Sequence, residues 1–250
     1  EAVYEISNAG QLYWFAEQVN NGNDTINGKL MDNIVVNPGT FAADGSYTPV
    51  NGESIRTWTP IGGGLNGYGG TFDGNYKTVS GLYYTGSRDI IGLFGFVPDG
   101  TVKNVGVVNS YLNGGNMVGG VAGFNGSSGI IENCYSNGFV SGYGVIGGVA
   151  GRNYGSIRNC YFYGSVSGDF NVGGIVGFQD SDYPITGCYY LADSETDTFD
   201  GTTFMTAQQF ASGEVAYLLN GSKNNGIWKQ TIGSDASPNF SGEAVYYGYI

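Results

Sequence analysis

The sequence contains three cysteines that recur at a nearly regular spacing, and each is followed by a tyrosine. They form the pairs Cys134-Tyr135, Cys160-Tyr161 and Cys188-Tyr189, and the cysteines are 26 and 28 residues apart. A thiol nucleophile needs a neighbouring base, usually histidine, and a metal site needs converging ligands such as two cysteines at CxxC spacing. The sequence contains no histidine and no such cysteine pair. We therefore predict an inward ladder of packed apolar thiols, without a disulfide, a metal or a cofactor.

The tyrosine after each cysteine suits contact with a ligand better than the thiol does. Because side chains alternate along a strand, the tyrosines are expected on the face opposite the cysteines, as an outward stripe. Their rings could stack on sugars while their hydroxyls bond polar groups. Stacked tyrosines could equally shield the ladder beneath them and pack against one another. The candidate ligand-binding residues are Tyr135, Tyr161 and Tyr189.

A block of glycine, two apolar residues and glycine recurs through the middle of the chain. Its copies are GLFG at 92–95, GVAG at 120–123, GVAG at 148–151 and GIVG at 174–177, so the first glycines lie 28, 28 and 26 residues apart. A second series keeps the same order, with VKNV from 102, IENCY from 131, IRNCY from 157 and ITGCY from 185. Motifs that keep one order through successive units indicate an internally repeated fold.

The period and composition of the units favour one repeat architecture. Glycine, valine, isoleucine, tyrosine, serine and asparagine dominate them, and these residues favour strands and turns over helices. Leucine-rich repeats need leucines at fixed offsets, yet no leucine lies between Leu112 and Leu191. Propeller blades need about 40 to 50 residues. We therefore predict a β-solenoid in which each coil has about three short strands and coils stack about 4.8 Å apart.

Glycines and asparagines are expected at the corners of these coils. Gly148 and Gly174 should occupy turn or strained backbone positions, where a side chain is unfavourable. The asparagines that share one offset should form a buried ladder that satisfies backbone groups at a corner. They are Asn104, Asn133 and Asn159.

The glycine-bracketed blocks, followed by IENCYSNGFVSG and IRNCYFYGSVSG, resemble the GLUG repeat of bacterial surface proteins. The segment GGTFDGNYKTVSGLYY from residue 69 resembles the entry coil that precedes such repeats, and the two flanks resemble segments beside them. The resemblance implies an all-β, right-handed parallel β-helix with coils of about 26–28 residues, in an exported, adhesin-like surface protein. It implies no enzyme activity and no catalytic residues.

Both flanks are expected to end the solenoid with short amphipathic helices. Asn8 and Gln11 resemble a capping box before one apolar helical face, and Thr206 could cap a second helical segment. Such helices would cover the hydrogen-bonding edges at the ends of the stack. We predict one elongated domain, with an N-terminal cap and entry coils at 1–68, repeats at 69–192 and a C-terminal cap with a short helix at 193–250.

Composition limits the partners. The 250 residues carry a formal net charge of −12, which disfavours nucleic acid and anionic membrane surfaces. No stretch approaches the roughly 20 apolar residues of a membrane span, so we expect no membrane insertion. The resemblance to surface proteins implies an extracellular or cell-surface location, and we expect a monomer that binds a host glycan or a host or bacterial surface protein.

A polysaccharide-active enzyme, a lyase or a glycosidase, is the alternative function, together with the non-catalytic β-helix of a larger secreted hydrolase. Those enzymes need clustered carboxylates, or a basic residue beside an acidic calcium site. Two acidic runs lack the spacing of known calcium motifs and resemble solvated loop faces, so we expect no catalysis. The candidates are Asp169, Asp180, Asp182, Arg152 and Arg158, and the second run is Asp193, Glu195, Asp197 and Asp200.

Overall fold

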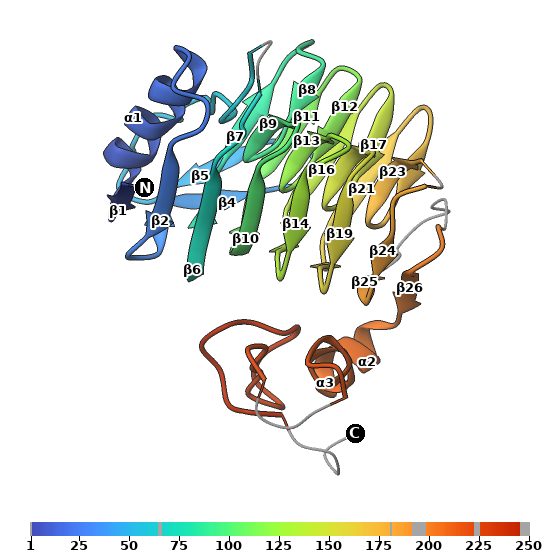
Figure 1. Cartoon of the computed structure of the whole chain (residues 1–250). Helices are drawn as coiled ribbons and strands as arrows, with labels where there is room; N and C mark the ends of the chain where they lie inside the picture. Colours follow the sequence, from blue (N-terminus) through green and yellow to red (C-terminus); the bar gives the residue numbers. More distant parts are fainter. Residues whose placement is uncertain (1, 65–66, 181, 192–198, 223–225, 246–250) are drawn as a thin grey trace.

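The chain winds into a parallel β-solenoid whose coils lie side by side along one axis (Figure 1). A computed structural model describes residues 2–64, 67–180, 182–191, 199–222 and 226–245. Every strand pairing between coils is parallel, and hydrogen bonds join each coil to the next. The predicted all-β solenoid is therefore confirmed.

One long sheet forms the base of the solenoid, and we call it the basal sheet. Its strands are β1 (Val3–Ile6), β2 (Asn27–Leu30), β3 (Ile34–Val35), β6 (Thr71–Ser80), β10 (Thr101–Val108), β14 (Ile130–Glu132), β15 (Tyr135–Ser136), β19 (Ser156–Arg158), β20 (Tyr161–Phe162), β24 (Ile185–Thr186), β25 (Cys188–Leu191) and β26 (Thr202–Met205).

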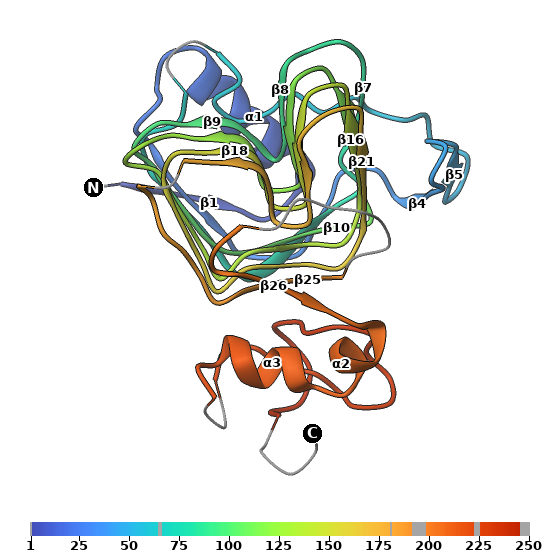
Figure 2. The ribbon, with the colours of Figure 1, turned by 90° about the vertical axis from the view of Figure 1, so that its right-hand side faces the viewer.

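Three four-stranded sheets complete the coils, and Figure 2 shows them in cross-section. The second sheet contains β7 (Tyr83–Thr85), β11 (Tyr111–Gly114), β16 (Phe139–Gly142) and β21 (Ser165–Gly168). The third contains β8 (Ile90–Ile91), β12 (Met117–Gly119), β17 (Val145–Gly147) and β22 (Val172–Gly173). The fourth contains β9 (Phe94–Val97), β13 (Ala122–Asn125), β18 (Ala150–Asn153) and β23 (Val176–Gln179).

A complete coil holds five short strands, such as β14 to β18, where the sequence predicted about three. Two features divide the coil into more strands than the sequence predicted. A left-handed asparagine breaks the basal strand, and the glycine-bracketed block bends the chain between the third and fourth sheets. Asn133 has φ 51° between β14 and β15.

The predicted asparagine ladder is present at this corner, but Asn104 is buried whereas Asn133 and Asn159 are half-buried. Asn104, Asn133 and Asn159 have φ values of 56°, 51° and 51°, in the left-handed region that asparagine tolerates better than most residues. Nδ2 of Asn133 donates to Oδ1 of Asn104 at 3.1 Å, and Nδ2 of Asn104 donates to Asp73 at 3.0 Å. Gly187, with φ 60°, takes the same corner in the next coil.

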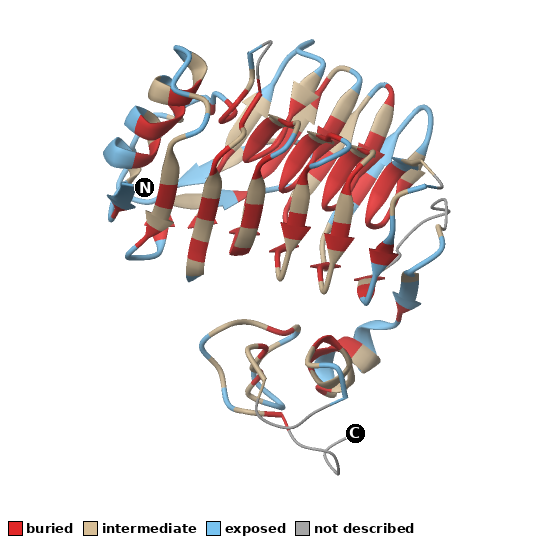
Figure 3. Cartoon of the chain, in the orientation of Figure 1, coloured by how far each residue is buried: buried red, intermediate tan, exposed pale blue. Residues whose placement is uncertain are grey.

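The interior is a set of apolar columns, one residue per coil in each column. Figure 3 shows the buried residues running through the strands of the stack. The apolar pairs of the repeated blocks are fully or almost fully buried. They are Leu93-Phe94, Val121-Ala122, Val149-Ala150 and Ile175-Val176.

Helix α1 (Ala9–Asn20) covers the N-terminal end of the solenoid (Figure 1). Asn8 caps it by accepting the backbone N–H of Gln11 at 3.0 Å. The ring of Phe15 packs 5.8 Å from Phe72 and 6.1 Å from Tyr68, which joins the helix to the core. This helix covers the first coil as the sequence predicted.

The helices of the C-terminal segment, residues 199–222 and 226–245, lie elsewhere than predicted. Helices α2 (Ala207–Ala211) and α3 (Glu214–Leu219) lie against the outer face of the basal sheet and not across the end of the stack (Figures 1 and 2). The reason is that β26 pairs with β25 and so continues the basal sheet before the chain turns under it. The acidic residues 193, 195 and 197 lie outside the described residues.

Candidate functional site

The tyrosines predicted to form an exposed stripe are mostly covered. Tyr161 is 0% exposed and Tyr135 is 5% exposed, while Tyr189 is half-buried. The first two rings stack with centroids 4.9 Å apart and planes 8° apart. Trp228 of the C-terminal segment packs 5.4 Å from Tyr161 and 6.0 Å from Tyr135.

The expectation of a solvent-exposed binding stripe is therefore wrong for Tyr135 and Tyr161. The hydroxyl of Tyr161 donates to the carbonyl of Pro238, and burial raises the pKa of Tyr135 to about 12. The two rings bind the chain's own C-terminal segment, so no external ligand reaches them in this structure. Packing, the other interpretation of the stripe, accounts for both.

The three cysteines lie in the core, each 0% exposed and each a free thiol. The backbone N–H of Cys134 donates to Sγ of Cys160 at 3.4 Å, which places the two residues in neighbouring coils of one column. Burial raises the pKa of the Cys160 and Cys188 thiols. A buried neutral thiol is a poor nucleophile, so the arrangement serves packing.

The acidic candidates are not brought together with a base. Asp169 and Asp182 are exposed, and Oδ1 of Asp180 accepts the backbone N–H of Asp182 within one turn. Arg158 is paired with Glu132, whose Oε2 lies 2.6 Å from Nη2. Within the described part of the chain, no three His, Cys, Asp or Glu side chains are grouped so that they could hold a metal ion.

A different row of side chains runs along the fourth sheet, one per coil. The strand register aligns Phe96 with Phe124, Phe124 with Arg152, and Arg152 with Phe178. The rings of Phe96 and Phe124 stack with centroids 4.8 Å apart and planes 15° apart. The sequence analysis missed this row, although each member is the residue that directly follows a glycine-bracketed block.

Tyr154 joins the row from the turn after β18. Its ring stands edge-on to Phe124 at 5.5 Å and to Phe178 at 6.2 Å. Cζ of Arg152 lies 4.6 Å from the Tyr154 centroid and 5.0 Å from the Phe178 centroid, within the range of cation–π contacts. An Nη2 hydrogen bond from Arg152 to the Tyr154 hydroxyl fixes the pair. We call Phe96, Phe124, Arg152, Tyr154 and Phe178 the aromatic row.

Two other aromatic rows are covered by segments distant in the sequence. The row of Tyr135 and Tyr161 on the basal sheet is covered by the C-terminal segment. On the second sheet, Phe41 of the hairpin β4 (Gly39–Phe41) and β5 (Tyr47–Pro49) stacks 5.6 Å from Tyr83. Among the described residues, the rings next to Phe124 and Phe178 all belong to the aromatic row itself, and Phe178 is 36% exposed. Of the three rows of stacked rings, the aromatic row is therefore the one left partly open to solvent.

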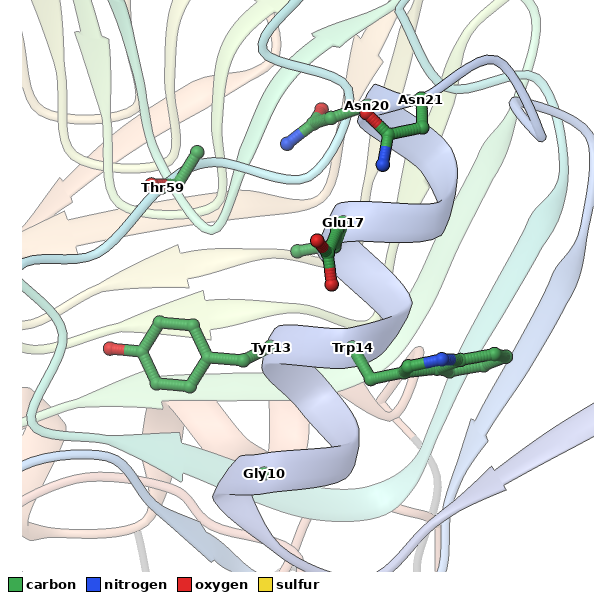
Figure 4. Close-up of a pocket in the computed structure, with 8 residues that line it drawn as sticks. Gly10, Tyr13, Trp14, Glu17, Asn20, Asn21 and Thr59 are labelled. Carbon is green, nitrogen blue, oxygen red and sulfur yellow. The ribbon is translucent and has the colours of Figure 1, made fainter.

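A shallow depression beside α1 is a second candidate. It has a volume of about 490 Å³ and includes Tyr13, Trp14, Glu17 and Asn20 in its lining (Figure 4). Tyr13 and Trp14 project from opposite sides of the helix, so their rings do not converge. The amide of Asn20 is occupied by the carbonyl of Pro60 and the N–H of Gly63. This depression is a weaker site than the aromatic row.

Fold and surface together define a parallel β-solenoid built from glycine-bracketed coils. Residues 142–167 match the family model described as the GLUG motif, which confirms the resemblance expected from the sequence. A solved structure described as "a putative immunoglobulin A1 protease from Bacteroides ovatus" has a TM-score of 0.60 and 19% identity, and covers 95% of this chain and 92% of that chain. At that identity the likeness shows the fold alone. No curated protein matches the sequence.

Across the described residues, no helix is both long and apolar enough to span a membrane.

Proposed function

We propose that the chain is an extracellular, adhesin-like binding or display module of a bacterial surface protein, without catalytic activity, and that its contact surface is the aromatic row. One observation carries the proposal: this row is open, whereas the chain's own segments cover the other two aromatic rows. Partly exposed rings are costly to leave in water, and aromatic residues and arginine are enriched where proteins bind partners.

The solenoid also suits display. Each coil is hydrogen-bonded to its neighbours along four sheets, so the row is held on a stiff support. The GLUG motif and the fold neighbour support a surface or secreted setting. The neighbour's description also favours a second candidate, in which this solenoid is the non-catalytic part of a larger secreted hydrolase.

The test is an array of glycans and surface proteins, probed with the purified chain and with Phe124→Ala/Phe178→Ala. The matched control is Tyr143→Ala/Phe170→Ala, because those rings are 63% and 56% exposed on turns outside the row. We expect the first variant to lose about tenfold or more in affinity, the equivalent of about 1.4 kcal/mol, and the control to bind like the parent.

Both variants must keep the β-rich circular dichroism of the parent. Equal binding by the Phe124/Phe178 variant would overturn the assignment of the contact surface. Turnover of any arrayed polysaccharide or protein would contradict the absence of catalysis.

A further inference from the structure

We propose that Arg152 makes the aromatic row a binding site for acidic sugars, in which the guanidinium pairs with the carboxylate of a uronic or sialic acid residue. The inference rests on the proposed function, because it names the ligand class of the same surface.

Arg152 stands where the repeat would otherwise place an aromatic ring. Its register partners on both sides, Phe124 and Phe178, are phenylalanines. The aromatic row is therefore apolar except in one coil, where Arg152 gives it a positive charge. That charge lies between two aromatic rings and not at the tip of a loop.

This guanidinium has no carboxylate partner among the described residues, where the ion pairs formed are Lys103–Asp73 and Arg158–Glu132. Its Nε is buried without a hydrogen-bond acceptor, so a ligand that arrives from solvent would pair with the Nη groups. Arg158 on the basal sheet is the contrast, since both its Nε and its Nη2 are engaged by Glu132. An arginine without a carboxylate, on a chain with a net charge of −12, retains free capacity for an anion.

The arginine is also held in a fixed pose. Cation–π contacts with Tyr154 and Phe178, together with the bond to the Tyr154 hydroxyl, restrict its side chain before a ligand arrives. A planar guanidinium binds a carboxylate through two parallel hydrogen bonds, and such charge-assisted bonds are stronger than neutral ones. Because the guanidinium is already oriented, less side-chain rotamer entropy is lost when a ligand binds.

The surrounding rings favour an oxygen-rich ligand. Phe96 and Phe124 stack on each other along the row, so their ring edges and not their faces are directed outward. Aromatic edges carry partial positive charge, and they contact hydroxyl and ring oxygens favourably. Tyr154 stands edge-on to both neighbouring phenylalanines and places its hydroxyl beside the guanidinium.

A sugar fits this wall better than a peptide or a nucleic acid. Peptides commonly add a strand to a free sheet edge, whereas Arg152 lies on β18, which β13 and β23 pair on both sides. Nucleic acid presents a line of phosphates that a chain of net charge −12 repels. A single carboxylate on an otherwise neutral sugar needs only one cation, and the row supplies one.

The experiment compares galacturonic acid with galactose, its carboxyl-reduced form, and sialyllactose with lactose, by titration calorimetry on the whole chain. Arg152→Gln removes the charge, and Arg152→Phe removes it while continuing the ring column, so that folding is preserved. Arg88→Gln is the matched control, because Arg88 is an exposed arginine outside the row. Melting temperatures are measured for all variants.

We expect the parent to bind at least one acidic sugar about tenfold or more tightly than its neutral counterpart. Both Arg152 variants should lose that difference, and Arg88→Gln should keep it. Equal affinity of the parent for acidic and neutral sugars would overturn the inference while leaving a sugar-binding module intact. Unchanged selectivity in folded Arg152→Phe, or no binding of any of the four probes, would also overturn it. A protein ligand bound through the row would leave the proposed function standing.

Discussion

The glycines that bracket each apolar pair are explained by what lies beside their backbone. Gly148 and Gly174 lie in the bends between the third and fourth sheets, as predicted for turn positions, but neither has a positive φ angle. A Cβ at Gly148 would instead collide with the Phe162 ring and the carbonyl oxygen of Gly174, and one at Gly174 would collide with the Tyr190 ring. The glycines thus allow the backbone to approach the rings of the basal sheet, one coil after another.

Replacing Gly148 by valine is therefore expected to lower the free energy of unfolding by about 1–3 kcal/mol or more, because the core cannot accept the added volume without shifting. Gly64→Ala is the control, since nothing lies within 4 Å of an added Cβ there. Urea denaturation at equilibrium measures both. Unfolding curves for Gly148→Val and Gly64→Ala that coincide with the parent would show that close approach is not the reason for the glycine.

The buried thiols and tyrosines predict how stability changes with pH. Burial raises the pKa of Cys160, Cys188 and Tyr161 above the values these groups have in an unfolded chain. The unfolded state then releases protons at a lower pH than the folded state, so the free energy of unfolding falls as pH rises above about 8.5 and again above about 10.

Urea titrations at neutral and alkaline pH test this expectation, with thiol labelling as a second measurement. The folded chain should resist a thiol reagent at a pH where the urea-unfolded chain reacts fully. Rapid labelling of all three cysteines with an unchanged circular dichroism spectrum would contradict the burial of the column.

At the scale of elements, charges on the basal sheet alternate from coil to coil. Lys29 pairs in register with Asp73, Asp73 with Lys103, Lys103 with Glu132, and Glu132 with Arg158. Opposite charges across neighbouring strands stabilise a sheet, and like charges destabilise it. A shift of one residue along these strands would separate each charge from its opposite partner, so the alternation favours the observed register.

Glu132→Lys should consequently destabilise the stack more than Glu132→Gln, because it places three cations in succession. The difference should be about 0.2–1 kcal/mol, since Arg158 is partly exposed and solvent screens the interaction. Thermal and urea unfolding at low and high salt measure this difference in stability between the two variants. Salt should reduce the difference. Equal stability of the two variants at low salt would show that the ladder does not contribute.

At the scale of the whole molecule, the C-terminal segment is held to the solenoid by aromatic packing. Trp228 is 0% exposed and lies in one cluster with Tyr135, Tyr161 and Phe210. This cluster is separate from the core of the coils, so we expect that the segment can be released while the coils remain folded.

Trp228→Ala is expected to remove about 3–5 kcal/mol from the docking of this segment. Amide hydrogen exchange should then lose protection in α2 and α3 while β13 and β18 keep theirs. Tyr143→Ala is the control, because that ring is 63% exposed on a turn. Equal loss of protection across the coils would mean that segment and solenoid unfold as one unit.

Much of this architecture could be predicted from the sequence, because it depends on features that repeat from one coil to the next. The interval between the glycine-bracketed blocks predicted parallel coils, and the shared offset of the asparagines predicted a ladder at a corner. The lack of a partnering histidine indicated packing for the cysteines. Each of these features depends on a residue and its equivalents one coil away, so the same local conformation repeats and its pattern appears along the chain.

Which outward rings remain open was decided only by the tertiary structure. The sequence placed Tyr135 and Tyr161 on the outer face, but residues more than 60 positions downstream cover them. Phe41 in the same way covers Tyr83, while Arg152 and Phe178 in the fourth sheet stay accessible. Periodicity determines the face to which a side chain points, because alternation is a local property of a strand. Burial of that face depends on long-range docking, which no repeat encodes.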